Sequence, residues 1–62
     1  MNIEVTKEAF DLIFEQCVFQ GIENLEHANK FYYYNSNANQ NGILIRNFIE
    51  NKIQYYLIDI NA

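Results

Sequence analysis

The end of the chain carries the pattern that most constrains its fold. Two runs rich in β-branched and aromatic residues, 43–49 and 53–60, flank the polar break Glu50-Asn51-Lys52. Runs of this kind on either side of a short polar turn are typical of a β-hairpin. We therefore predict a hairpin over 43–60, and we expect the rest of the chain to cover it.

Side-chain alternation sorts the hairpin onto two faces. A turn at Glu50-Asn51 or at Asn51-Lys52 gives the same two faces, whereas a three-residue loop would swap the assignments. One face carries Ile43, Ile45, Asn47, Ile49, Gln54, Tyr56, Ile58 and Ile60. The other carries Leu44, Arg46, Phe48, Ile53, Tyr55, Leu57 and Asp59.

Both faces are mostly apolar, although Arg46, Glu50 and Asp59 mark the second face as the more polar one. An antiparallel sheet with one solvated side would show one polar face. A single helix covers only one face, so the other needs a protein partner, a second subunit or the amphipathic tyrosines to be soluble.

Length and composition limit the architecture and the compartment. Sixty-two residues make one domain, 1–62, and a chain of this size buries only about 60% of its unfolded surface. The chain has one cysteine, which excludes an internal disulfide and favours a reducing cytoplasm. We find no signal-peptide pattern and no apolar run near the roughly 18 residues that span a bilayer. We therefore expect a cytoplasmic protein outside the membrane.

The net charge of −4 is unevenly placed. Residues 1–29 hold six acidic residues and one basic residue, whereas residues 30–62 hold three basic and two acidic residues. Phosphate binding needs clustered lysine and arginine, which this chain lacks. We therefore expect neither nucleic acid nor an anionic membrane as the main partner.

The first half of the chain predicts a short strand at 3–5 and a helix at 7–20. Thr6 is a suitable N-cap, and Val5 and Phe10 are spaced for a hydrophobic staple. Gly21 suits a left-handed helix ending, in which Ile22 folds back. The apolar stripe of this helix should pack on the sheet. It consists of Ala9, Phe10, Ile13, Phe14, Cys17 and Val18.

The opposite side of the predicted helix is acidic but not uniformly polar. Glu8, Asp11 and Glu15 form a row there, and Leu12 and Phe19 project among them. Either another segment of the chain covers these two apolar residues, or the row is an acidic binding face.

The middle of the chain completes the predicted architecture. Residues 23–29 fit a short second helix, 30–34 a strand, and 35–42 an asparagine-rich loop that Gly42 closes with a positive φ. The strand and the hairpin then form a three-stranded antiparallel meander. We predict a two-layer α+β domain, β-α-(α)-β-β-β, with one main helix across the sheet and the first strand at a sheet edge.

The residues that carry chemistry do not form a catalytic or metal-binding pattern. Cys17 lies in the apolar stripe with no base beside it, so we interpret it as a core residue. Glu23 and His27 share a helical face but lack further ligands for zinc. The carboxylates of the helix lie on an exposed face, not in a cleft. We therefore predict no enzyme, no metal and no cofactor.

Three functional hypotheses follow. The first is a stoichiometric inhibitor of a larger protein, in which the acidic row suits a basic, nucleic-acid-handling target. Small acidic inhibitors from phages and mobile elements resemble the chain in size and charge alone. The second is a self-associating homodimer, and the third is a weak single-strand binder that stacks bases on tyrosines. The predicted partner-binding residues are Glu8, Asp11, Leu12, Glu15, Phe19, Tyr32, Tyr34, Leu44, Phe48 and Tyr55.

Overall fold

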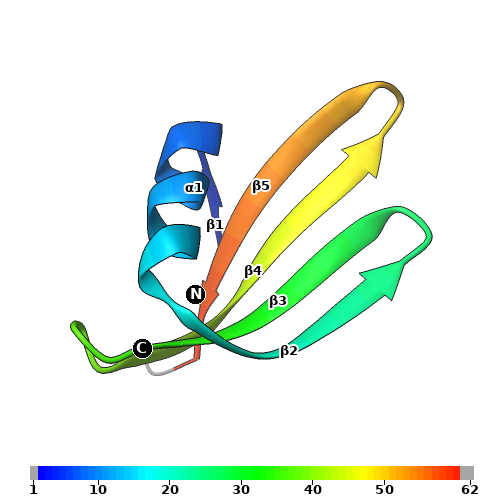
Figure 1. Cartoon of the computed structure of the whole chain (residues 1–62). Coiled ribbons are helices and arrows are strands. Elements are labelled where there is room, and N and C mark those ends of the chain that lie inside the picture. The colour runs from blue at the N-terminus through cyan, green and yellow to red at the C-terminus, as the bar shows by residue number, and fades with distance from the viewer. Residues whose placement is uncertain (1, 61–62) are drawn as a thin grey trace.

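Five strands and one helix make up the computed structural model, which describes residues 2–60 (Figure 1). In chain order they are β1 (Asn2–Val5), α1 (Lys7–Gln16), β2 (Val18–Leu25), β3 (Ala28–Asn35), β4 (Gln40–Ile49) and β5 (Lys52–Asp59). The strands form one antiparallel sheet in the order β1-β5-β4-β3-β2. The predicted class is confirmed: a small α+β domain whose helix packs on one side of an antiparallel sheet.

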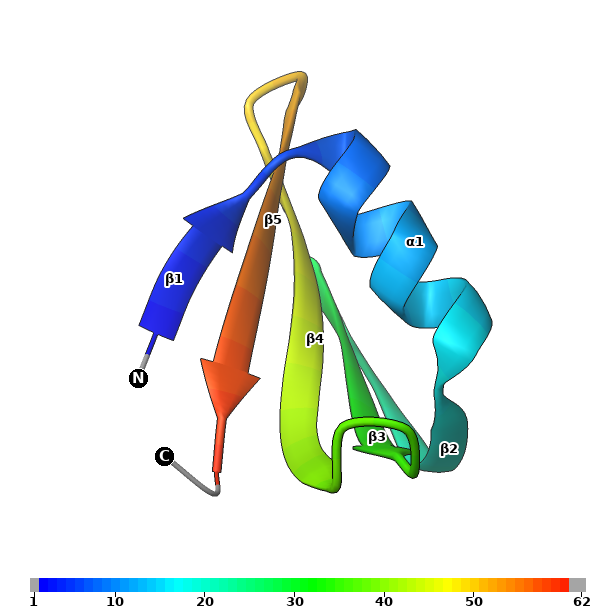
Figure 2. The ribbon, with the colours of Figure 1, turned by 90° about the vertical axis from the view of Figure 1, so that its left-hand side faces the viewer.

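The first strand lies at a sheet edge, as predicted, and its neighbour is the last strand. Ile3 of β1 is the partner of Leu57 of β5. The helix α1 then connects β1 at one edge of the sheet to β2 at the other edge, and it crosses one face of the sheet on the way (Figure 2). Strands β2 to β5 follow one another as a meander.

The predicted terminal hairpin is present, with a two-residue turn. Glu50 and Asn51 both have positive φ, 51° and 67°, which is the backbone that a tight hairpin turn requires. Phe48 therefore pairs with Ile53, and Leu44 pairs with Leu57. The two predicted sets of side chains consequently lie on opposite faces of the sheet.

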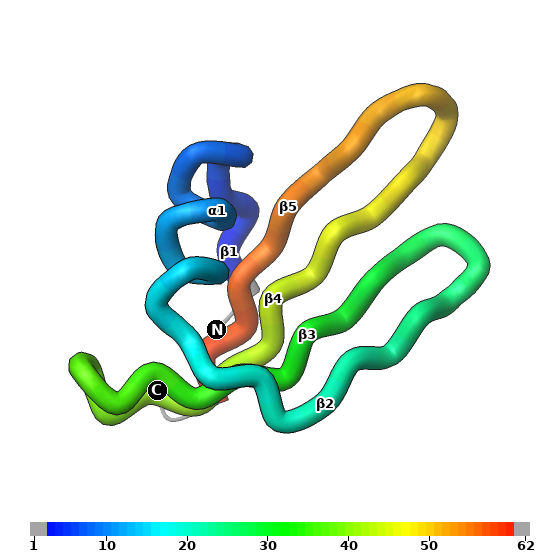
Figure 3. Tube along the Cα trace, in the orientation of Figure 1, coloured from blue at the N-terminus to red at the C-terminus, as the bar shows by residue number. Residues whose placement is uncertain are grey.

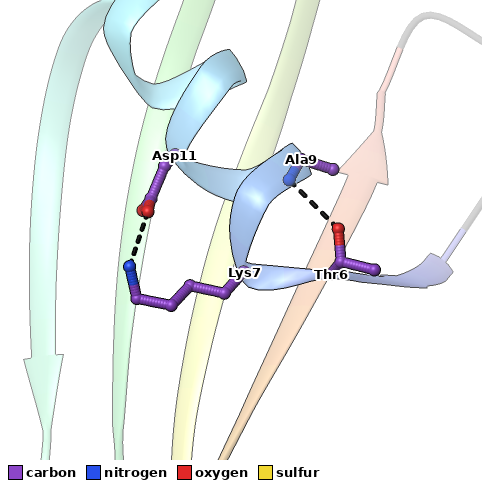
Figure 4. A network of polar contacts seen from close by, with 4 residues as sticks. All are labelled: Thr6, Lys7, Ala9 and Asp11. Atoms are coloured by element: carbon purple, nitrogen blue, oxygen red, sulfur yellow. Dashed lines mark hydrogen bonds and ion pairs between the residues drawn. The ribbon is translucent and has the colours of Figure 1, made fainter.

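The helix begins where the sequence indicates and ends earlier. The Thr6 hydroxyl accepts a hydrogen bond from the backbone N–H of Ala9 at 3.1 Å, so the predicted N-cap is confirmed (Figure 4). The helix stops at Gln16, because Cys17 is already extended, with φ −102° and ψ 152°. The prediction of a helix to residue 20 with a left-handed Gly21 is wrong.

The predictions for the end of the first helix and for a second helix over 23–29 are wrong, because β2 takes residues 18–25, a turn follows, and β3 begins at Ala28. In β2, three of the four large apolar residues are β-branched or aromatic, Val18, Phe19 and Ile22, and pairing with β3 satisfies the backbone of β2 on one side. A bulge shifts the register between Phe19 and Gly21. The sheet therefore gains a strand that local helix signals had concealed.

The asparagine-rich segment is shorter than predicted, because β4 begins at Gln40. The left-handed residue of the turn is Asn39, with φ 49°, and not Gly42. Gly42 is needed for another reason. A Cβ there would lie 2.5 Å from both the carbonyl oxygen of Ile58 and the hydroxyl of Tyr33, whose ring covers the glycine.

The core lies between α1 and the middle of the sheet. Phe10 of the helix, Phe31 and Tyr33 of β3, and Leu44 of β4 are its buried members. The helix therefore covers the face that Arg46 and Asp59 had marked as wetter, which corrects that inference. Arg46 and Asp59 do not belong to the core. The pair Leu44 and Leu57, which lies between them on the same face of β4 and β5, is apolar and packs under the helix.

Candidate protein-binding surfaces

The described residues expose more large apolar side chains than they bury. Four apolar residues form the buried core, whereas eleven large ones are exposed. The exposed ones are Ile3, Leu12, Phe14, Val18, Ile22, Leu25, Tyr32, Phe48, Ile49, Ile53 and Ile60. Exposed apolar side chains that gather on one surface mark a site of interaction, so their distribution over the fold matters.

The first surface is the sheet face opposite α1, which we call the open face. Register places Tyr32, Ile43 and Ile58 side by side in one row across β3, β4 and β5. Lys30, Ile45 and Tyr56 form the next row. No element within residues 2–60 covers this face (Figure 2). Its principal residues are Val18, Leu25, Lys30, Tyr32, Tyr34, Ile43, Ile45, Asn47, Ile49, Gln54, Tyr56 and Ile58.

Carboxylates stand at both ends of the lysine row on the open face. Glu23 is opposite Lys30 at the β2 edge, and Glu4 is opposite Tyr56 at the β1 edge. The Tyr32 hydroxyl donates to Glu23 at 3.2 Å, and partial burial together with this carboxylate raises the pKa of Tyr32. This face therefore offers tyrosines and isoleucines between acidic ends, an arrangement that repels a phosphate backbone.

The second surface lies on the same face as the helix but beyond its reach. The turn ends of the β2–β3 and β4–β5 hairpins project away from α1 (Figures 1 and 3). We call the helix-side residues of these projecting ends the arm surface: Ile22, Asn24, Asn29, Arg46, Phe48 and Ile53. Ile22, Phe48 and Ile53 are 60%, 38% and 52% exposed.

Arg46 is fixed at the centre of the arm surface. Its Nε and Nη2 atoms both donate to Oδ1 of Asn29, at 3.2 and 3.1 Å. Asn29 in turn donates to Asn24 at 2.8 Å. The guanidinium lies 5.7 Å from the ring centre of Phe31 and 5.5 Å from that of Phe48. Hydrogen bonds and cation–π contacts thus hold one cation among apolar side chains.

The third surface is the outer side of α1. Glu8, Asp11, Leu12 and Glu15 are all exposed there, and Leu12 is 59% exposed. Lys7 donates to Asp11 at 2.7 Å (Figure 4), and this bond raises the pKa of Lys7. Asp11 is thus in an ion pair, whereas Glu8 and Glu15, the other acids beside Leu12, form no ion pair within residues 2–60.

The predicted partner-binding residues do not form one surface. Leu44 is fully buried, so its assignment as a contact residue is wrong. Phe19 belongs to β2 and not to the helix, and its ring packs 4.5 Å from that of Phe14. Tyr55 is likewise half-buried, 4.8 Å from Phe10. Both residues lie on the sheet face that the helix covers, and the sequence had left open which face that would be.

The remaining predicted residues lie on three different surfaces. Glu8, Asp11, Leu12 and Glu15 are on the helix, Tyr32 and Tyr34 on the open face, and Phe48 on the arm surface. Ile43, Ile45, Tyr56 and Ile58 were missing from the prediction although they line the open face. The alternation that sorted the hairpin into two faces was the signal that could have found them.

Groups with catalytic or ligating potential are dispersed. Cys17 is half-buried beside the core, and burial raises the pKa of its thiol. His27 stands in the β2–β3 turn, 3.6 Å from Glu26, and helps to line an apolar groove of about 350 Å³ with Phe48, Ile49 and Glu50. Within residues 2–60 no three His, Cys, Asp or Glu side chains are grouped to hold a metal ion.

Comparison with known proteins adds no relative. No family model matches the chain, and no curated protein or solved structure is significantly similar to it. Among the described residues, no helix is long and apolar enough to cross a membrane. The functional argument therefore depends on the surfaces of the molecule itself.

Proposed function

We propose that this chain is a small protein-binding module that acts stoichiometrically, as an inhibitor of a larger protein. The observation that supports this proposal is the open face: an apolar sheet surface on which no part of the described chain packs. A monomer of this size gains nothing from leaving such a face in water, whereas a binding protein needs it.

The chemistry of the open face suits a protein partner. Tyr32, Tyr34 and Tyr56 present rings that bury large areas with few rotatable bonds, and their hydroxyls bond at the rim. Ile43 and Ile45 add apolar surface on a central strand whose backbone is paired on both sides. Little conformational entropy is lost when such a rigid surface binds, which favours affinity.

The charge of the chain indicates the kind of partner. The net charge is −4, and Glu8 and Glu15 are exposed on the helix. Negative potential speeds association with a basic surface and discourages acidic competitors. A basic, nucleic-acid-handling protein is therefore the target class that we propose. The same charge, with Glu4 and Glu23 on the open face, weighs against direct binding of single strands by the tyrosines.

The test is affinity capture from host extract with matched variants, read by mass spectrometry. The double variant Tyr32→Ser with Tyr56→Ser removes two rings from the open face, and Leu12→Ser is the control on the helix. Circular dichroism and thermal melting establish that each variant is folded.

We expect one protein to be captured by the wild type and by Leu12→Ser, and to be lost with the double variant. Capture of the same protein by a folded double variant would contradict the assignment to the open face.

A further inference from the structure

We propose that the arm surface binds the outer face of α1 from a second copy of this chain, and that the exchange is reciprocal. The result is a two-fold homodimer that leaves the open face free. This inference goes beyond the proposed function, because it concerns a different surface and does not require the larger protein.

The first step is the unsatisfied charge of Arg46. No ion pair joins Arg46 to a carboxylate within residues 2–60. Asn29 accepts from one side of the guanidinium, at Nε and Nη2. The opposite side, which includes Nη1, keeps donors in the fork geometry that fits a carboxylate. The arm surface is thus prepared for one acidic side chain.

The second step is the apolar surround. Arg46 is the single charged strand residue of the arm surface, and Ile22, Phe48 and Ile53 expose their side chains around it. Water-exposed apolar side chains beside a fixed cation favour an occupant that combines a large apolar residue with an acid. A purely acidic segment would leave the apolar side chains in water, and a purely apolar one would leave the cation unpaired.

The chain itself presents that combination on α1. Leu12 follows Glu8 by four positions and precedes Glu15 by three, so the three side chains share one face of the helix. None of them packs into the core, and Leu12 is 59% exposed. The outer helix face and the arm surface are therefore complementary in both charge and polarity.

The third step is geometry. The hairpin ends project beyond α1, so a second helix can lie on them next to the first (Figures 1 and 3). A two-fold axis makes each protomer give its helix and receive its partner's, and Arg46 then meets a carboxylate twice. An interface in which both copies use the same two surfaces closes on itself and does not form a filament.

A matched pair of isoleucines tests this arrangement by sedimentation equilibrium over a range of concentrations. Ile53 and Ile49 belong to the same hairpin and are 52% and 53% exposed, but they lie on opposite faces. We expect a dimer for the wild type. Ile53→Glu places an acid among the acids of the incoming helix and should raise the dissociation constant by more than about tenfold. Ile49→Glu should leave it unchanged.

Charge exchange gives a second, independent measurement. Arg46→Glu and either Glu8→Arg or Glu15→Arg should each weaken the homodimer, because like charges then meet at both contacts. Arg46→Glu is then mixed with the arginine variant, Glu8→Arg or Glu15→Arg, that weakened the homodimer. The mixture should form a heterodimer, because opposite charges meet at both contacts again. Circular dichroism tests whether Arg46→Glu folds. If it does not, the comparison of Ile53→Glu with Ile49→Glu decides the question.

Three results would overturn the proposal: a monomer at every concentration, a dimer broken by Ile49→Glu but not by Ile53→Glu, or folded charge variants that neither weaken the dimer nor restore it on mixing. Capture of a larger protein by the Ile53→Glu variant reports separately on the open face. Failure of the dimer and failure of the proposed function are therefore distinguishable.

Discussion

Two regions of one sheet face differ sharply although the same strands build them. Under the helix, Leu44 of β4 is completely buried, whereas Phe48, four residues further on the same face, is 38% exposed. On β5, Leu57 packs against the core and Ile53 is exposed. The difference does not come from the residue types, which are large and apolar in both regions.

The length of the covering element explains this difference. Helix α1 has ten residues and is about 15 Å long, whereas the ten residues of β4 extend about 33 Å. The second layer therefore ends before the strands do. Apolar residues under the helix stabilise the fold, and residues of similar size and polarity beyond it remain available for another molecule.

A pair of truncations, one in each region, should give the largest effect on stability and therefore tests this contrast first. Leu44→Ala removes a fully buried side chain and should lower the free energy of unfolding by about 3 kcal/mol. Phe48→Ala should lower it by about 1 kcal/mol or less, because this ring is already partly in water. Denaturant unfolding of both variants measures the difference. Equal losses would mean that the arms are part of the cooperative core.

The two glycines provide the next comparison. Gly42→Ala would force a Cβ against the backbone of Ile58 and the ring of Tyr33, and backbone gives way poorly. We expect a loss of about 2 kcal/mol. Gly21→Ala meets nothing closer than 4.0 Å, at Tyr32, so its effect should be small. A thermal melt in which the two variants behave alike would contradict the close approach at Gly42.

A smaller effect concerns the start of the covering helix. Thr6→Ala removes the acceptor of the Ala9 N–H and should cost about 1 kcal/mol. Thr6→Ser keeps the hydroxyl and should be close to the wild type. Chemical denaturation monitored by helical circular dichroism would resolve the two, and an unaffected Thr6→Ala variant would show that packing alone holds the helix.

The smallest expected effect is a difference in thiol reactivity between the regions. Burial raises the pKa of the Cys17 thiol and limits access to it. Because the thiolate is the reactive form, alkylation near neutral pH should be several-fold slower in the folded chain than in urea. The matched reporter is Cys17→Ser with Ile53→Cys, whose thiol on the arm should react nearly as fast folded as unfolded when the protein is diluted until it is monomeric. Similar protection of both thiols at that dilution would show that the monomer itself covers its arms.

Local signals predicted part of this fold correctly. The terminal hairpin, its two faces and the Thr6 cap followed from residue type and spacing, because each depends on neighbours in sequence. Strand β2 could not be predicted from local signals. Its first residue, Val18, continues the helical stripe, and only pairing with β3 makes 18–25 extended.

The candidate surfaces show the same limit. The apolar surplus could be inferred from alternation, but alternation left open which face the helix covers, and Leu44 was misplaced among the contact residues. Arg46 carried no recognisable motif. Its fixed position became visible only when Asn29 and Phe31, distant in sequence, were placed beside it.

The sequence by itself determined the periodicities: which side chains share a face of a strand or helix, where the hairpin turns, and that the apolar surface exceeds what a short chain can hide. The tertiary structure decided which face the helix covers and how far along the strands the cover reaches. The physical reason is that alternation and capping are local properties of the backbone. Burial depends instead on the position and length of a second layer, which are set by contacts between residues far apart in the chain.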